Sequence, residues 1–313
     1  MKRNILLLFT FFACITVQGQ TPVRLVDLRS EHLDRPIGLD NPVPRLSWRM
    51  EDGRQGAVQT SWRIVVDEDS LNVVNGCGRM WDSGKNDSRN QLVAYAGKKL
   101  QPFTRYYWKV ICSDMEYKET ASPVSYLETG MMGMQHWQGA WIGDGKDIHY
   151  GPAPYFRKEF KTGKKVKSAR AYIAAAGLYE LYINGEKIGD HCLAPLYTRF
   201  DRRNLYVAYD VTSQLQNGDN AIGVLLGNGW YNHQSKAVWD FDRAPWRNRP
   251  TFCLDLRITY TDGSVETIPT DLSWRTASGA ITFNSIYTGE HYDARLEQKD
   301  GALRNSMIPS GAE

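Results

Sequence analysis

Short alternations of apolar and polar residues dominate the chain from about residue 23 onward. The segments 61–67 and 105–112 place β-branched or aromatic side chains at every second position and are bounded by Gly, Pro, Asn or Asp. In the segment 61–67 this spacing puts Trp62, Ile64 and Val66 on one face, which is typical of a half-buried strand. The pattern predicts an all-β protein.

Residues 22–130 hold about seven such strands, separated by turn residues at intervals of about 8 to 12 positions. This spacing is typical of an antiparallel sandwich of the immunoglobulin or fibronectin type III kind. We interpret Trp48, Trp62 and Trp108 as core-filling side chains. No candidate chemistry falls in this domain.

A Gly- and Met-rich stretch at residues 130–133 interrupts the alternation and marks a domain boundary. Residues 136–297 are again rich in strands and fit a larger jelly-roll sandwich of the galactose-binding-like type. Within it, Asp262-Gly263 predicts a two-residue type I′ hairpin turn. Residues 211–215 are the one segment of this domain expected to form a short helical turn.

The N-terminus carries the pattern of a secretory signal peptide. Lys2 and Arg3 precede an unbroken apolar run over residues 5–17, and small and polar residues follow. We expect removal of residues 1–19 and a secreted or periplasmic mature chain. No later stretch approaches the roughly 20 apolar residues that a membrane-spanning helix needs, so no membrane span is expected.

Charge and composition limit the classes of partner that the chain is expected to bind. The formal net charge is only +3 and the charges are interspersed, which argues against nucleic acid as a partner. The chain contains 10 Trp and 17 Tyr, a surplus that suits either stacking on sugars or filling β-sandwich cores. The four cysteines after the signal peptide show no CxxC spacing, so no zinc site is expected and buried free thiols are predicted: Cys77, Cys112, Cys192 and Cys253.

The most distinctive stretch covers residues 177–232 and reads GLYELYINGEKIGDHCLAPLYTRFDRRNLYVAYDVTSQLQNGDNAIGVLLGNGWYN. With PYFRKEF before it and GEHYDAR after it, this stretch resembles the N-terminal jelly roll of bacterial α-L-rhamnosidases of glycoside hydrolase family 78. The first domain, which opens with LRSEHLDRPIGLDNPVPRLSWRM, resembles the fibronectin-like domain that precedes that jelly roll. The resemblance extends to about residue 297 and implies rhamnose-containing glycans or glycosides as partners.

The segment LLGNGWYN is the candidate sugar-binding loop. An apolar strand emerges there into Asn228, Trp230 and Tyr231, and two glycines allow the backbone to approach a ligand closely. An amide beside aromatic rings can pair with hydroxyls while the rings contact the C–H face of a sugar. Asn184 is interpreted first as part of an Asn-Gly hairpin turn, with ligand contact as the alternative.

Calcium is the one cofactor that the resemblance suggests. Some jelly rolls of the family look like rhamnose-binding modules in which a calcium ion holds sugar hydroxyls. Asp190, Asn184 and Asn228 would be the contributors here, since calcium takes six to eight oxygen ligands, usually with carboxylates among them. No recognisable calcium loop is present, and the alternative is that these residues only shape loops.

No catalytic residue is predicted in this sequence, and whether the chain is an enzyme is left open. Family 78 enzymes resemble the inverting scheme of one acid and one base, and in the family both carboxylates lie in an (α/α)₆ barrel downstream of the jelly roll. Glu290 and Asp293 in GEHYDAR are interpreted as structural, because strand alternation directs them to opposite faces. Residues 298–313 depart from the family pattern, as expected for a truncated or frameshifted gene product.

The sequence therefore predicts the non-catalytic N-terminal portion of a secreted α-L-rhamnosidase, limited to carbohydrate binding or structural support. The alternative from another class is a free-standing rhamnose-binding protein, with or without calcium. A third interpretation is a pair of scaffold domains that bind nothing.

Overall fold

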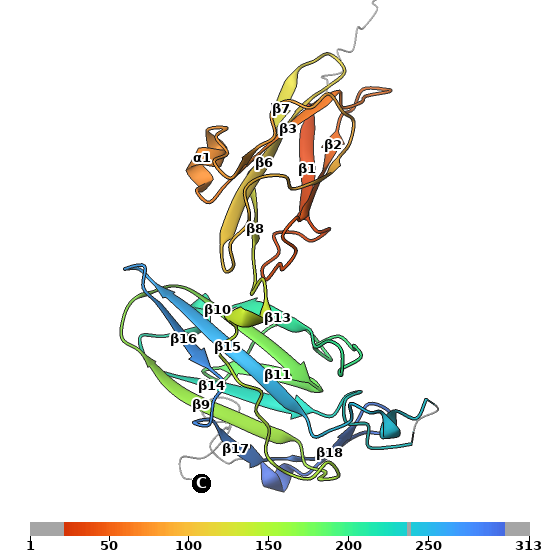
Figure 1. Cartoon of the computed structure of the whole chain (residues 1–313), viewed down its shortest axis with the longest axis vertical. Helices are drawn as coiled ribbons and strands as arrows, with labels where there is room; N and C mark the ends of the chain where they lie inside the picture. The colour runs from red at the N-terminus through yellow and green to blue at the C-terminus, as the bar shows by residue number, and fades with distance from the viewer. Residues whose placement is uncertain (1–21, 237–238, 298–313) are drawn as a thin grey trace, which may run out of the picture. The chain divides into compact units, whose positions relative to one another are not determined.

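The computed structural model describes residues 22–236 and 239–297, and it divides them into two compact units (Figure 1). The first unit comprises the chain up to Pro36, Pro42–Lys99 and Arg105–Leu127; the second comprises Ile37–Asn41, Leu100–Thr104 and the chain from Glu128 onward. The signal peptide predicted at residues 1–19 and the tail at 298–313 lie outside the described residues. None of the helices in the described ranges has the length and apolar character of a membrane span.

The predicted all-β class is confirmed, with an immunoglobulin-like sandwich first. One sheet has the order β1 (Arg24–Ser30), β2 (Arg45–Glu51), β5 (Leu92–Ala94). The other has the order β4 (Trp81–Asp82), β3 (Ser61–Asp67), β6 (Arg105–Ser113), β7 (Glu119–Ala121), and β8 (Ser125–Glu128) also pairs with β6. A short helix α1 (Ser70–Val74), which the sequence pattern did not predict, begins where the Asp69 side chain accepts from the Leu71 N–H at 2.9 Å.

The face predicted for β3 is buried as expected. Ile64 pairs with Val110 and Val66 pairs with Trp108 across the β3–β6 ladder, so apolar side chains meet on one face. Trp108 is fully buried, and the other two tryptophans assigned to the core are buried with it. Val65 is buried as well, so β3 is covered on both faces and not on one alone.

The second unit is a jelly-roll sandwich of two antiparallel sheets. The four-stranded sheet has the order β13 (Tyr206–Asp210), β10 (Val166–Ala176), β15 (Thr251–Tyr260), β16 (Val265–Pro269). The five-stranded sheet has the order β12 (Glu186–Lys187), β11 (Leu178–Ile183), β14 (Gly218–Gly227), β9 (Pro154–Thr162), β17 (Arg275–Ser278). A separate hairpin is formed by β18 (Ile281–Ser285) and β19 (Gly289–Tyr292).

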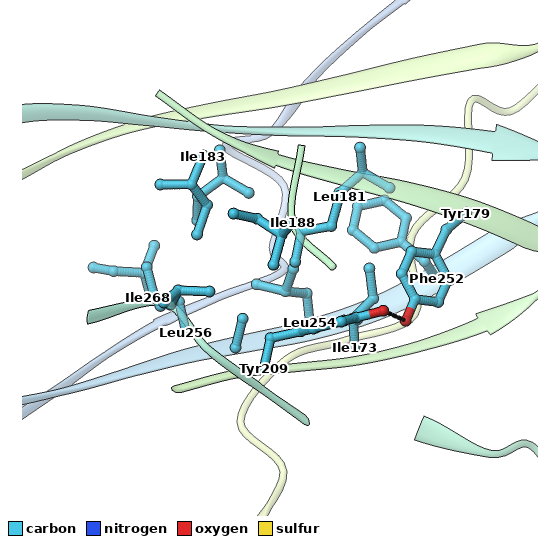
Figure 2. Close-up of a cluster of buried hydrophobic side chains, with 14 of the residues drawn as sticks. Ile173, Tyr179, Leu181, Ile183, Ile188, Tyr209, Phe252, Leu254, Leu256 and Ile268 are labelled. Carbon is cyan, nitrogen blue, oxygen red and sulfur yellow. Dashed lines mark hydrogen bonds between the residues drawn. The ribbon is translucent and has the colours of Figure 1, made fainter. Parts of the chain in front are cut away.

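The core of this unit lies between its two sheets (Figure 2). Every second residue of the central strands points inward, as in Ile173 of β10 and Leu254 of β15 on one side and Leu181 of β11 on the other. Two tyrosine hydroxyls reach into this apolar layer and pair with each other, Tyr179 Oη to Tyr209 Oη at 3.0 Å. Burial raises the pKa of both phenols, so each stays a neutral hydroxyl that the other can satisfy.

Two predicted turns have different outcomes. Asn184 and Gly185 have φ of 49° and 83° and join β11 to β12 as a two-residue turn, as the Asn-Gly pair predicts. The type I′ turn predicted at Asp262-Gly263 is wrong, because only Gly263 has positive φ and the Tyr260 N–H donates to Ser264 O around a three-residue loop. The hairpin is present, with Gly263 in the left-handed position of that longer loop.

The expected helical turn is present as a 3₁₀ turn, η2 (Thr212–Gln214). Within the described residues of the second unit it is accompanied by η1 (Met134–His136), η3 (Phe241–Arg243) and η4 (Ala294–Leu296), so the expectation of a single turn is wrong. Cys77, Cys112, Cys192 and Cys253 are unpaired. Cys112 and Cys253 are buried as predicted, and burial raises their thiol pKa values to about 12 and about 11; Cys77 and Cys192 are exposed, contrary to the prediction.

Asp67 at the end of β3 is the most extensively bonded carboxylate of the first unit. It is buried and accepts from Arg79 Nε and Nη2, both at 3.0 Å, and from the backbone N–H groups of Asp69 and Arg79, both at 2.9 Å. These bonds, with the Arg79 side chain first among them, outweigh burial and hold the pKa of Asp67 well below its usual value. A carboxyl group with a depressed folded-state pKa stabilises the fold above its unfolded pKa, and that stability is lost as the pH falls through the folded value.

We therefore expect Asp67→Asn to lower the free energy of unfolding of the first domain by about 1–3 kcal/mol at pH 7. The gap between wild type and variant should shrink below about pH 4, the unfolded-state pKa of an aspartate. Urea unfolding at pH 7 and at pH 2.5, followed by tryptophan fluorescence, measures both quantities. Asp82→Asn is the matched control, because its partner Arg63 and Asp82 itself are both more than a third exposed and such pairs contribute about 1 kcal/mol or less. A gap that stays constant with pH would contradict this assignment.

Candidate functional site

Asparagine side chains form a hydrogen-bonded network where β14 leaves the core. Asn228 is 1% exposed and follows directly on Gly227, the last residue of the strand. Its backbone N–H donates to Asn284 Oδ1 at 2.7 Å and its Nδ2 donates to Asn284 O at 2.9 Å. Its Oδ1 accepts from Asn232 Nδ2 at 3.0 Å. The side chain predicted to bind sugar hydroxyls is therefore used to join the end of β14 to the end of β18.

The network continues into the loop that follows β14. Asn232 Nδ2 also donates to Ile148 O at 3.0 Å, and Asn232 Oδ1 accepts from Arg247 Nε at 3.2 Å. Arg247 Nη1 donates to Asp242 O at 3.0 Å, across the 3₁₀ turn η3. Burial of a polar group costs little free energy when the group is hydrogen-bonded. These bonds hold the loop in place at Asn232 near its start and at Arg247 near its end.

Just beyond this loop, Arg249 ties the start of β15 to the segment before β9. Its guanidinium donates to both oxygens of Asp144, at 2.6 Å from Nη2 and 3.1 Å from Nε, and both side chains are 6% exposed. The remaining donors reach Tyr150 O at 2.7 Å and Pro152 O at 2.6 Å. A fully bonded buried ion pair of this kind fixes geometry, because removal of either partner leaves an uncompensated charge.

Aromatic rings gather in the loop that follows β14 and in the segments that contact it, and they form what we call the Trp230 cluster. Its members are within 6.5 Å of a neighbouring ring centroid: Tyr197, Phe200, Trp230, Tyr231, His233, Phe241, Trp246 and Tyr287. Trp230 is the central ring, in contact with Phe241 at 5.1 Å and Tyr287 at 5.3 Å. Tyr197 and Tyr287 are 47% and 52% exposed, so the cluster offers aromatic surface to solvent.

A cavity of about 450 Å³ lies beside the turn that bears this cluster. It is formed by the ends of β11, β14 and β18, and its lining includes Gly229, Asn284, Leu193 and two carboxylates, Glu180 and Glu290. Burial alone would raise the pKa of Glu180, but hydrogen bonds from Lys187 and Tyr182 outweigh burial and hold that pKa below its usual value. An acid that protonates a leaving group needs a raised pKa, so Glu180 is unsuited to that role.

Asp293, the second carboxylate of the GEHYDAR segment, is bonded to Arg295. Its Oδ1 accepts from the Arg295 N–H at 3.1 Å at the start of η4, and its carboxylate forms an ion pair with the Arg295 guanidinium at 2.6 Å. The Arg295 side chain also holds the pKa of Asp293 below its usual value. The interpretation of Asp293 as a structural residue agrees with these contacts.

The remaining predicted site residues are not brought together with Asn228. Asn184 lies at the opposite end of the β11–β14 pair, where its Oδ1 accepts from the Ala221 N–H at 2.9 Å and its Nδ2 donates to Gln214 O at 2.8 Å. Seven residue steps lead from Ala221 along β14 to Asn228, a distance of roughly 23 Å in an extended strand. Asp190 has a fully exposed carboxylate, 3.9 Å from His191. Trp230 and Tyr231 do lie together, in the Trp230 cluster.

These positions do not fit a shared calcium site. Asn228 Oδ1 already accepts a hydrogen bond, Asn184 is distant from it, and calcium requires six to eight oxygen ligands. Within residues 22–236 and 239–297, no group of three or more His, Cys, Asp or Glu side chains is placed to hold a metal ion.

Sequence reasoning missed several members of the site, among them Asn284, His233, Phe241 and Tyr287. The first and last belong to the β18–β19 hairpin, 56 or more positions after Asn228, and no local pattern links them to that loop. His233 and Phe241 follow Trp230 within eleven positions, and the aromatic content of residues 230–246 was the signal that could have found them. A larger groove of about 910 Å³ on the four-stranded side, lined by Trp137, Trp141 and Arg203 among others, was also not predicted.

Comparisons with known proteins agree with this architecture. Residues 25–133 match the family model of the Rha78A-like N-terminal immunoglobulin domain, and residues 164–303 match that of the α-L-rhamnosidase N-terminal domain. An α-L-rhamnosidase of Formosa agariphila is 33% identical over 96% of this chain and 35% of its own length. One from Alteromonas sp. is 31% identical over 86% of this chain and 30% of its own. The solved α-L-rhamnosidase of Dictyoglumus thermophilum superposes with a TM-score of 0.83 at 37% identity, over 91% of this chain and 33% of that one.

The fold thus defines a class, an immunoglobulin-like sandwich followed by a jelly roll with an aromatic loop. These two domains match the N-terminal domains of α-L-rhamnosidases, as the sequence predicted. The chain spans about a third of the length of the relatives that it matches.

The amide network makes a prediction about stability. Asn228→Ala should lower the free energy of unfolding of the jelly roll by about 1–3 kcal/mol, because Asn284 O then loses its buried donor and Asn232 Nδ2 loses one acceptor. Thermal or urea unfolding of both proteins measures the difference. Asn204→Ala is the control, since Asn204 is exposed and makes one 3.2 Å bond to Phe200 O. Equal stability of the two variants would show that the network does not hold the loop.

Proposed function

We propose that these two domains form a non-catalytic N-terminal portion of a secreted α-L-rhamnosidase and that the jelly roll binds rhamnose-containing glycans or glycosides. The observation that carries the proposal is the Trp230 cluster, in which partly exposed rings follow directly on a hydrogen-bonded amide network in the chain. Aromatic faces contact the apolar C–H face of a sugar, and few polar groups then fix its orientation.

Support for rhamnose as the sugar comes from the relatives, which bear the name α-L-rhamnosidase. Support for a non-catalytic role comes from the carboxylates of the jelly roll cavity. Glu180 is ion-paired with Lys187 and has a lowered pKa, whereas the inverting scheme needs one carboxylic acid that keeps its proton near neutral pH.

Calorimetric titration of the purified chain with L-rhamnose, in buffers with and without calcium, tests the binding. We expect a saturable heat in both buffers, since the predicted calcium ligands are not brought together. Trp230→Ala should weaken binding about tenfold or more, the effect of truncating a central aromatic contact. Trp141→Ala is the matched control, because Trp141 is 43% exposed but lines the other groove. No heat from the wild type in either buffer would leave only the scaffold role.

The proposal that the chain is non-catalytic has its own test. Incubation of the chain with an aryl α-L-rhamnoside should release no phenol above the buffer rate. Turnover that Glu180→Gln abolishes would overturn the proposal, because Glu180 would then act as the acid that its lowered pKa argues against.

A further inference from the structure

The loop after β14 holds three buried polar atoms that lack partners within the described part of the chain: His233 Nε2, Asp242 Oδ1 and Trp246 Nε1. His233 is 1% exposed. An unpaired buried donor or acceptor costs about 1–3 kcal/mol, and such atoms are rare in folded proteins unless they serve another purpose. Three within fourteen positions of one loop stand in contrast to the side-chain amides of Asn228 and Asn232, whose oxygen and nitrogen atoms are each hydrogen-bonded.

The hydrogen-bond pattern defines which of the three atoms donate. His233 Nδ1 accepts from the Ser235 N–H at 3.3 Å, and in a neutral imidazole the other nitrogen then carries the proton. His233 Nε2 and the indole Nε1 of Trp246 are therefore both N–H donors. Asp242 Oδ1 is an acceptor, and Asp242 O is already used by Arg247. The set of two donors and one acceptor matches a sugar hydroxyl, which both accepts and donates.

Phe241 is the residue that connects the three groups. Its ring stacks on the His233 ring at 6.5 Å and contacts the Trp246 ring at 6.3 Å, and Asp242 is its neighbour in the chain within η3. The rings of Trp230 and Tyr287 also contact His233, at 5.9 Å and 5.0 Å. Aromatic faces offer an N–H group only a weak contact, so these rings do not replace the missing oxygen acceptor.

We propose that His233, Asp242 and Trp246 form the polar half of a pyranose site, in which the two ring N–H groups donate to sugar hydroxyls and Asp242 Oδ1 accepts from one. The apolar half is the rings of Trp230 and Phe241. Tyr287 contacts His233 from the turn between β18 and β19 and is 52% exposed. The site as proposed requires a change of the Tyr287 rotamer to admit the sugar, and side-chain changes of this kind are common at binding surfaces. This inference rests on the proposed carbohydrate binding and transfers its polar contacts from Asn228 to His233.

Two substitutions at His233 separate the donor from the ring. In His233→Asn the amide oxygen replaces Nδ1 as the acceptor for Ser235, and nothing replaces Nε2. In His233→Gln the longer side chain places an amide N–H near the position of Nε2. We expect His233→Asn to weaken L-rhamnose binding about tenfold, the effect of one lost hydrogen bond, and His233→Gln to stay within about threefold of the wild type. Calorimetry on the full chain with L-rhamnose, L-fucose and D-mannose measures the affinities, and thermal unfolding is recorded for each variant.

The outcomes are distinct. Rhamnose binding by the wild type that is unchanged in His233→Asn would overturn this site and leave the proposed function standing. A wild type that binds none of the three sugars would overturn both. If either His233 variant unfolds, Trp246→Phe decides, because it removes the Nε1 donor and keeps an aromatic ring: about fivefold weaker binding supports the site, and equal affinity with lowered stability assigns these donors to a structural water.

Discussion

The second domain depends on how strand β14 ends. Val224 and Leu226 are fully buried in the sandwich core, and a chain that leaves such a core must satisfy every backbone and side-chain polar group it carries out. Asn228 does so by bonding to both the backbone and the side chain of Asn284. The end of β14 is thereby joined to β18, and the position of the β18–β19 hairpin follows from the same bonds.

The position of the aromatic cluster is a consequence of that junction. Trp230 and His233 follow Asn228 by two and five positions, and Tyr287 follows Asn284 by three positions in the β18–β19 turn. Because the two asparagines are bonded, rings from both segments meet at 5.0–5.3 Å. Arg249 and Asp144 fix the far end of the loop with a buried pair. The loop that carries the aromatic rings is thus held at both ends.

Local patterns in the sequence were sufficient for the strands, the fold class and the Asn184-Gly185 turn, because period-two alternation and positive φ are properties of neighbouring residues. Local patterns do not reveal contacts that join distant segments. Nothing near Asn228 in sequence indicates Asn284 as its partner, so the bonds between the two asparagines were not predicted. The turn at Gly263 was predicted one residue too short, since Asp262 is compatible with a negative φ and the sequence does not state which loop length the ladder requires.

The contrast between Asn228 and His233 bears on where a ligand would bind. Both side chains are 1% exposed and lie in one loop, yet the amide oxygen and nitrogen of Asn228 are both bonded and one ring nitrogen of His233 is not. An amide atom that is already hydrogen-bonded gains less from a hydroxyl than an atom that has no partner. An unpaired donor recovers its desolvation cost when a hydroxyl arrives. Binding energy is therefore available at His233, Asp242 and Trp246, while the asparagines supply the rigid support that keeps those groups in position.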